Sequence, residues 1–102
     1  RERYVGEFEE GERHGEGQEF YPDGKLKYKG NFRDNVRSDY GTYFYRNGDK
    51  YAGWFAANQP NGKGVYYFAD GDRFVGTFRS GRRHGYGVLY DRNGNRREAG
   101  QY

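Results

Sequence analysis

The chain has 102 residues, a net charge of +3 and a mean hydropathy of −1.39, which fit one small domain and exclude a large aliphatic core. It contains no Cys, which excludes disulfides and Cys-ligated metal sites, and no apolar run approaches the roughly 20 residues of a membrane-spanning helix. Twelve Tyr, eight Phe and one Trp argue against disorder and predict a core built from rings.

The chain is organised by an internal repeat. The pattern Tyr-x-Gly-x-Phe begins at Tyr4 and returns at Tyr28, Tyr51 and Phe74, with spacings of 24, 23 and 23 residues. A fixed period of this length predicts a tandem array of one supersecondary unit. We expect one array over residues 1–102, with copies at 4–27, 28–50, 51–73 and 74–97 and a partial copy at 98–102. Because the chain starts at Arg1, we expect it to be a piece of a longer array.

Each copy predicts two strands in chain order, counted from its first aromatic residue as position 0. The first strand covers positions 0 to 5, a loop with Gly or Asn at position 7 follows, and the second strand covers positions 11 to 17. Asp-Gly or Asn-Gly closes each copy, at 23–24, 47–48, 70–71 and 93–94. That dipeptide between alternating aromatic runs favours a two-residue type I′ turn. One extra residue follows it in copies one and four, and we expect a bulge or a three-residue loop to absorb it.

These elements predict an all-β fold: tandem β-hairpins in an elongated, twisted, single-layer antiparallel sheet, a meander with an aromatic-lined groove. We expect position 4 to face position 12 and position 0 to face position 16, so that Phe44 meets Tyr51 and Tyr67 meets Phe74. One face then carries the even-position rings as the core, and Gly at position 2 makes room for them. This even-position set is Tyr4, Phe8, Phe20, Tyr28, Phe32, Phe44, Tyr51, Phe55, Tyr67, Phe74, Phe78 and Tyr90. The opposite face carries Tyr43, Tyr45, Trp54, Tyr66 and Phe68, with Trp54 between Gly41 and Gly64.

The motifs together resemble the MORN repeat (membrane occupation and recognition nexus). Copy one, YVGEFEEGERHGEGQEFYPDG, and copy four, FVGTFRSGRRHGYGVLYDRNG, carry Tyr/Phe-x-Gly-x-Phe, a Gly at position 7 and His-Gly-x-Gly. Copies two and three depart from the pattern, because Ser38-Asp39 replaces His-Gly and Asn61 replaces His. The resemblance implies a curved ribbon of stacked hairpins with a groove and no catalysis of its own. Members of the family are scaffolds in cytoskeletal and ciliary structures, membrane-junction modules or accessory domains of enzymes, and some have been proposed to bind phospholipid.

No catalytic residue, cofactor site or metal site is expected. His14 and His84 are the only histidines and lie in different copies, so they do not converge on one point. The acids Glu7, Glu9 and Glu10 have no spacing that forms a pocket, and the glycines fall at strand and turn positions rather than in a phosphate-binding loop.

Two sets of residues are candidates for binding. Trp and Tyr are favoured interface anchors, so we expect partner binding or self-association through aromatic faces. These ring candidates are Tyr43, Tyr45, Trp54, Tyr66 and Phe68, with Phe32, Phe55 and Phe78 of the groove. Copy one is acidic, whereas copy four carries six arginines that can meet anionic lipid or an acidic surface. These arginines are Arg79, Arg82, Arg83, Arg92, Arg96 and Arg97. Nucleic acid is a poor partner, because the acidic first half repels phosphate.

The leading hypothesis is a non-enzymatic scaffold that binds a partner segment or another copy. One alternative is a peripheral membrane module that binds anionic phospholipid or phosphoinositide. Another is an accessory domain of a larger enzyme, such as a lipid kinase or lysine methyltransferase. We expect a cytoplasmic location, at membrane or cytoskeletal structures.

Overall fold

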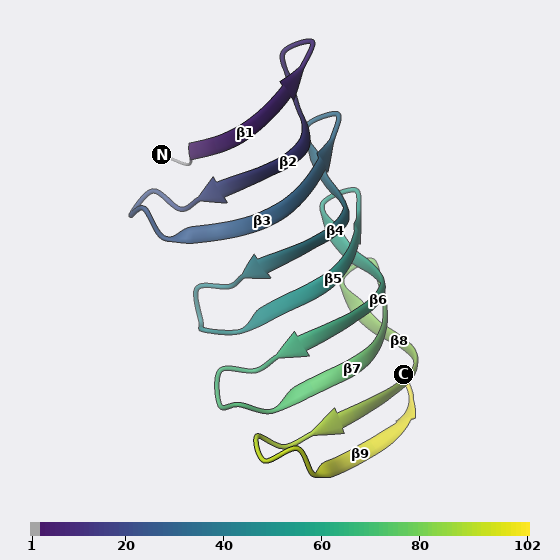
Figure 1. Cartoon of the computed structure of the whole chain (residues 1–102). Coiled ribbons are helices and arrows are strands. Elements are labelled where there is room, and N and C mark those ends of the chain that lie inside the picture. The colour runs from purple at the N-terminus through teal and green to yellow at the C-terminus, as the bar shows by residue number, and fades with distance from the viewer. Residues whose placement is uncertain (1–2) are drawn as a thin grey trace.

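The computed structural model describes residues 3–102, and these residues form one open sheet of nine strands without a helix. Each strand pairs antiparallel with the next in chain order, so the hairpins stack along the long axis of the molecule (Figure 1). The strands are β1 (Arg3–Glu9), β2 (Glu12–Phe20), β3 (Leu26–Arg33), β4 (Val36–Phe44), β5 (Lys50–Ala56), β6 (Gln59–Tyr67), β7 (Arg73–Arg79), β8 (Arg82–Tyr90) and β9 (Arg96–Gln101). The predicted all-β meander of tandem hairpins is confirmed.

Two kinds of turn lie at opposite ends of the strands (Figure 1). The tip inside each copy consists of positions 6 and 7, and both residues have positive φ in all four copies. Ala57 and Asn58, for example, have φ of 50° and 72°. Two consecutive residues with positive φ are typical of a type I′ turn, so the tight hairpin turn is inside the copy.

The Asp-Gly and Asn-Gly dipeptides form a longer loop between copies, and the prediction of a type I′ turn there was wrong. In the first of these loops the Tyr21 amide donates to the Lys25 carbonyl at 2.8 Å and the Gly24 amide donates to the Tyr21 carbonyl at 2.8 Å. Gly24 has a φ of 92°, and the loop is of the three-residue kind that ends on a left-handed glycine. The Asp23 carboxylate accepts a 3.0 Å hydrogen bond from the Lys25 amide, which favours this loop.

The longer loop shifts the register by one residue relative to the prediction. Tyr43, not Phe44, lies opposite Tyr51. Tyr66, not Tyr67, lies opposite Phe74. Within a copy, the tight tip pairs position 4 with position 9, and after an irregularity position 0 faces position 15. The expected pairings of position 4 with 12 and of position 0 with 16 were wrong. A slip of one residue moves every side chain of a strand to the other face.

In the second strand of each copy, the side chains therefore lie on the face opposite to the one predicted. Phe20, Phe44, Tyr67 and Tyr90 leave the face of the core rings, contrary to expectation. Tyr43, Tyr45, Tyr66 and Phe68 join that face and pack against the core. Trp54 stays on the opposite face, so the expected grouping of Trp54 with these four residues was wrong.

The extra residues of copies one and four are absorbed by bulges, one of the two expected ways. Glu19 faces Tyr28 whereas the next residue, Phe20, faces Leu26. The same irregularity follows Leu89 in the pairing of β8 with β9. The sheet thus keeps one register across copies of unequal length.

One row of glycines crosses the whole sheet. The members of the row, each opposite the next, are Gly6, Gly17, Gly30, Gly41, Gly53, Gly64, Gly76, Gly87 and Gly100. The position 0 rings lie flat over this row: a Cβ on Gly41 would overlap the Tyr28 ring, 2.6 Å from its Cε1. Tyr28, Tyr51 and Phe74 are fully buried there. The expectation that Gly makes room for the rings is confirmed.

The core is a ladder of edge-to-face rings at positions 0 and 4. The Tyr28 ring centroid lies 5.1 Å from that of Phe32 in its own copy and 5.1 Å from that of Phe55 in the next. Tyr51 repeats the arrangement with Phe55 and Phe78, at 5.3 and 4.9 Å. Each such pair stabilises the fold by about 0.5–1.5 kcal/mol beyond the area it buries. We call the face that carries this ladder the ring face.

The tip of the third hairpin allows a first prediction. Ala57 has a φ of 50°, a left-handed conformation that costs an alanine about 1–2 kcal/mol. Replacing Ala57 by Gly should therefore raise the free energy of unfolding by about 0.5–1 kcal/mol, after the greater chain entropy of Gly is subtracted. Ala56→Gly, one residue earlier in β5, should lower it instead. Chemical denaturation measures both, and a destabilised Ala57→Gly variant would contradict the prediction.

Candidate functional site

Two adjoining hollows lie on the face opposite the ladder, which we call the groove face. The first, of about 690 Å³, crosses β1 to β4, and the second, of about 360 Å³, crosses β4 to β7. Both are lined by the glycine row, and Tyr40 borders both. They therefore form one groove that runs along the array, with backbone as its floor.

Two rows of side chains form the walls of this groove. Positions 1 and 14 of successive strands face one another in the first wall, which consists of Val5, Gln18, Lys29, Thr42, Ala52, Val65, Val75, Val88 and Ala99. Positions 3 and 12 form the second wall, which consists of Glu7, Glu16, Asn31, Tyr40, Trp54, Lys63, Thr77, Tyr86 and Gln101. The first wall is mostly small and apolar, and the second carries the large rings.

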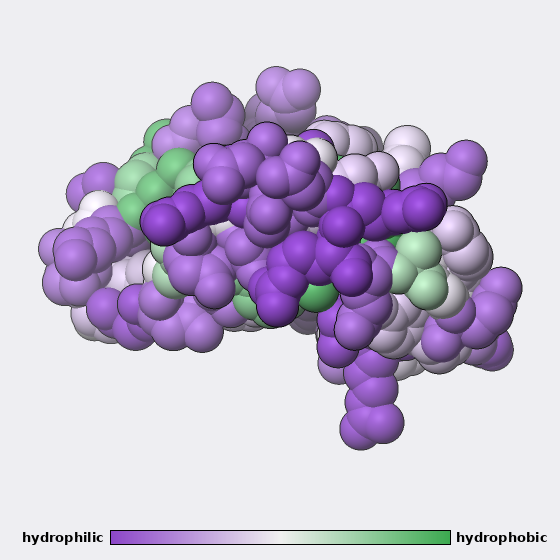
Figure 2. All heavy atoms as spheres, turned by 90° about the horizontal axis from the view of Figure 1, so that it is seen from below, coloured by the Kyte–Doolittle hydropathy of each residue, from purple (hydrophilic) through white to green (hydrophobic). Residues whose placement is uncertain are grey.

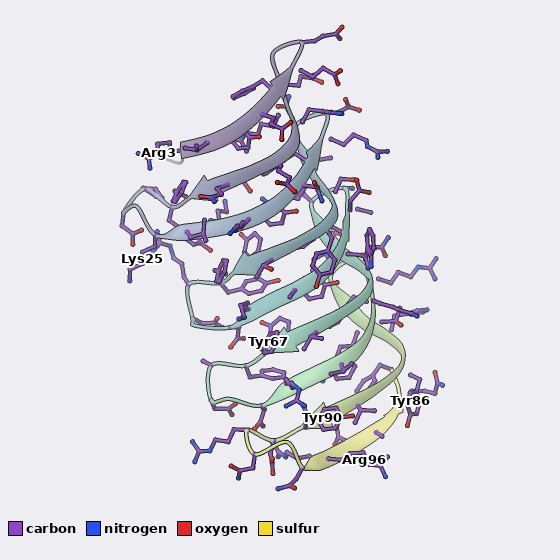
Figure 3. All side chains as sticks on the ribbon, in the orientation of Figure 1. Arg3, Lys25, Tyr67, Tyr86, Tyr90 and Arg96 are labelled. Atoms are coloured by element: carbon purple, nitrogen blue, oxygen red, sulfur yellow. The ribbon has the colours of Figure 1, made fainter. Side chains whose placement is uncertain are left out.

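Exposed apolar side chains gather on these walls. Trp54 and Tyr40 are 47% and 50% exposed and contact each other edge to face, with ring centroids 5.8 Å apart. Val5, Val75 and Tyr86 are also exposed, and Tyr86 projects at the edge of the molecule in Figure 3. Seen from below, the surface is mainly hydrophilic, with small apolar areas (Figure 2). The groove thus offers a row of apolar contacts to a partner.

Trp54 does not lie between Gly41 and Gly64, as the sequence suggested. Gly53 has that place, because Gly41 and Gly64 are its partners on the two neighbouring strands. Trp54 follows it at the irregularity of β5 and lies opposite Tyr40. Sequence reasoning missed Tyr40, Tyr86 and Val75 as groove residues. Val75 could have been predicted as a wall residue, because position 1 is also apolar in copies one and three.

The other predicted rings are on the ring face. Tyr43, Tyr45, Tyr66 and Phe68 form a second line of contacts, with successive centroids 4.7, 5.7 and 5.0 Å apart. The Tyr66 hydroxyl donates a 2.7 Å hydrogen bond to Asp49, which lowers the pKa of that carboxyl below its usual value. The position 4 candidates Phe32, Phe55 and Phe78 are buried in the ladder, so little of their surface is left for a partner.

A buried acid that sequence reasoning did not single out lies beside the ladder. Glu19, only 4% exposed, occupies position 15, where the other copies have Tyr or Leu. Its carboxylate oxygens each lie 2.7 Å from Nη1 of an arginine, Arg13 in its own copy and Arg37 in the next. These guanidinium groups also cover rings: Arg13 lies 4.7 Å from the centroid of Tyr4 and Arg37 lies 4.9 Å from that of Tyr43. Charge pairing and stacking thus fix the same two side chains.

Arg83 repeats this arrangement in copy four without an acid. Its guanidinium lies 5.2 Å from the ring centroid of Phe74 and 4.7 Å from that of Tyr102. Within residues 3–102, no carboxylate lies at ion-pair distance from Arg83. A pocket of about 350 Å³ opens beside it, lined by Tyr66, Phe68, Phe74, Phe78, Gly81, Arg82 and Arg83.

The late arginines do not form one patch. Arg79 and Arg82 flank the Ser80–Gly81 tip, whereas Arg92, Arg96 and Arg97 lie at the loop end of the same hairpin. Arg97 is also paired with Asp72. The positive charge of copy four is therefore divided between the two ends of its strands.

The histidines and acids show no catalytic arrangement. Nε2 of His14 lies 3.3 Å from a carboxylate oxygen of Glu9, and His84 is exposed in another copy. In the described part of the chain, no three His, Asp or Glu residues are grouped as metal ligands. A search of residues 3–102 also finds no helix long and apolar enough to span a membrane.

Comparison with known proteins agrees with the repeat geometry. The family model described as MORN repeat matches residues 4–25, 28–50, 51–73 and 74–96. These four segments begin at the same residues as the first four copies of the pattern, end within two residues of them and cover most of the chain. No curated protein matches the sequence.

Proposed function

Because this chain belongs to the MORN-repeat family, whose repeat is a non-catalytic module, we propose that it is a non-enzymatic scaffold that holds a segment of a partner protein in its groove. The proposed place of action is the cytoplasm, at membrane or cytoskeletal structures. The observation that carries the proposal is the gathering of Val5, Tyr40, Trp54, Val75 and Tyr86 along the two walls. Rings that are already held rigid bind at a small cost in ordering entropy.

The spacing of the walls favours an extended segment over a helix. The two walls stand two residues apart on each strand, about 6.6 Å between Cα atoms. An α-helix with side chains is about 10–12 Å wide and does not fit between them, whereas a single extended strand does. The floor between the walls is bare backbone, because a side chain at these positions would point to the ring face, so the backbone of the bound segment can approach closely.

The length of the groove sets the length of the segment. The hollows cross seven strands about 4.8 Å apart, so the groove spans about 29 Å, or about nine extended residues. One hairpin advances by about 9.6 Å, close to the 9.3 Å rise of three residues in a polyproline II conformation. The partner segment is therefore expected to contact each hairpin with about three residues.

The test is selection of binding peptides from a random 12-residue library on the immobilised wild-type chain. Selected peptides should lose at least tenfold in affinity when Trp54 is replaced by Ala or Val75 by Asp, because central aromatic anchors and apolar walls dominate such interfaces. Tyr67→Ala is the matched control: its exposed ring pairs with Lys50 outside the groove and should leave the affinity unchanged. Calorimetric titration gives the affinities.

Two results would overturn this function. One is a set of selected peptides that bind the Trp54→Ala and Val75→Asp variants as tightly as the wild type. The other is failure to select any peptide together with co-sedimentation on vesicles containing phosphoinositide, lost on Arg82→Glu and Arg83→Glu. That second result would establish the membrane alternative, in which each charge near the surface contributes about 1 kcal/mol.

A further inference from the structure

Three copies have an arginine at position 9 that stacks on an aromatic ring. Arg13, Arg37 and Arg83 each cover the position 0 ring of their own copy, at 4.7, 5.7 and 5.2 Å from its centroid. For the first two arginines, the Glu19 carboxylate completes the arrangement at 2.7 Å from each Nη1. The protein thus contains its own example of a carboxylate that is paired with guanidinium groups stacked on aromatic rings.

In copy four, neither of the two positions that would supply this carboxylate holds an acid, and Glu98, opposite Leu89, accepts a 3.1 Å hydrogen bond from the Tyr102 hydroxyl. Glu19 reaches its arginines from position 15 of the same copy and of the preceding copy. For Arg83 these two positions hold Leu89 and Tyr66. The Tyr66 hydroxyl is bonded to Asp49, and Asp49 also accepts from the Ala69 amide, so this acid has its own partners. The pocket of about 350 Å³ lies between Tyr66 and Arg83.

We propose that this pocket binds the carboxylate of a Glu or Asp side chain from a partner protein, which pairs with Arg83 while an adjacent apolar group packs on the rings. The site is on the ring face and is separate from the groove, so it does not depend on the function proposed for the groove. A carboxylate suits the pocket better than a phosphate. Among the described residues that line the pocket, Arg82 and Arg83 are the only charged ones, and a phosphate carries nearly two charges and needs more donors.

The probe is the blocked dipeptide acetyl-Phe-Glu-amide, titrated into the full isotope-labelled chain and followed by NMR. We expect saturable shifts of the Gly81 amide and the Arg83 side chain, with a dissociation constant on the order of 1 mM. Acetyl-Phe-Gln-amide should bind at least tenfold more weakly, since it lacks the charge that the guanidinium pairs with. The Trp54 indole signal, which reports the groove, should not move.

Two pairs of variants complete the test. Arg83→Gln should abolish binding of the dipeptide, whereas Arg92→Gln, in the loop between β8 and β9, should leave it unchanged. Leu89→Glu places an acid where Glu19 stands relative to Arg13, so it should pair with Arg83 and block the dipeptide, and Leu89→Gln should not. Dispersed spectra show that each variant is folded.

The proposal is wrong if the Gln dipeptide binds as tightly as the Glu dipeptide, or if Arg83→Gln has no effect. It is equally wrong if phenyl phosphate binds Arg83 much more tightly than the dipeptide, because the pocket is then a phosphate site. Movement of the Trp54 signal alone would place the dipeptide in the groove and would also overturn it. The groove proposal survives each of the first three results, since none of them involves Trp54.

Discussion

Replacing Glu19 by Ala should lower the free energy of unfolding by about 3 kcal/mol, the largest effect that we expect from a single polar substitution. The carboxylate is almost fully buried and contacts both Arg13 and Arg37 at 2.7 Å. Without it, two guanidinium groups remain beside the ladder with no opposite charge, and the loss of one partner of a buried pair typically costs 3–5 kcal/mol. Arg13 is partly exposed, so water recovers part of that cost.

The matched control is Glu16→Ala, which removes an exposed acid from the same strand. Urea denaturation should show a change of less than about 0.5 kcal/mol for this variant. In a double-mutant cycle, Arg37→Ala should cost less in the Glu19→Ala background than in the wild type, because the pair is already broken. Equal stability of the Glu19→Ala and Glu16→Ala variants would show that the buried ion pair contributes nothing.

Replacing Gly41 by Ala should destabilise the array by about 3 kcal/mol. The added Cβ would overlap the ring of Tyr28, which is fully buried and bonded through its hydroxyl to the Asn31 carbonyl at 2.9 Å. The ring cannot move away, because Phe32 and Phe55 each contact it with centroids 5.1 Å away. Overpacking a rigid core typically costs 1–3 kcal/mol. Here the added methyl group would meet a ring that already lies against the backbone.

Gly100→Ala is the control in the same glycine row. A Cβ there meets no atom within 4 Å, and the position lies in the edge strand β9. Thermal and chemical denaturation should therefore place Gly100→Ala within about 0.5 kcal/mol of the wild type. If Gly41→Ala were equally mild, the glycine row would not be needed to seat the rings of the core.

The binding residues were only partly predictable from the sequence. Trp54 is a candidate for partner binding both from the sequence and in the structure, because Trp is favoured as an interface anchor. Its neighbour Tyr40 was missed, since the expected register gave it no place beside Trp54. The six arginines form one cluster in the sequence but lie at two ends of a hairpin. Glu19 was missed as a buried acid because its two arginine partners are in different copies.

The sequence by itself determined the period, the number of copies, the all-β hairpin fold and the pairing of rings with glycines. Those features follow from local signals that recur in every copy: alternation, Gly where backbone must be bare, and turn residues at fixed positions. The tertiary structure decided which of two turns is the tight one. Each turn carries an Asn or a Gly, which tolerate positive φ, so composition did not distinguish Ala57–Asn58 from Asp70–Gly71. The difference is one residue of loop length, and in a sheet one residue decides which face every side chain of the next strand occupies.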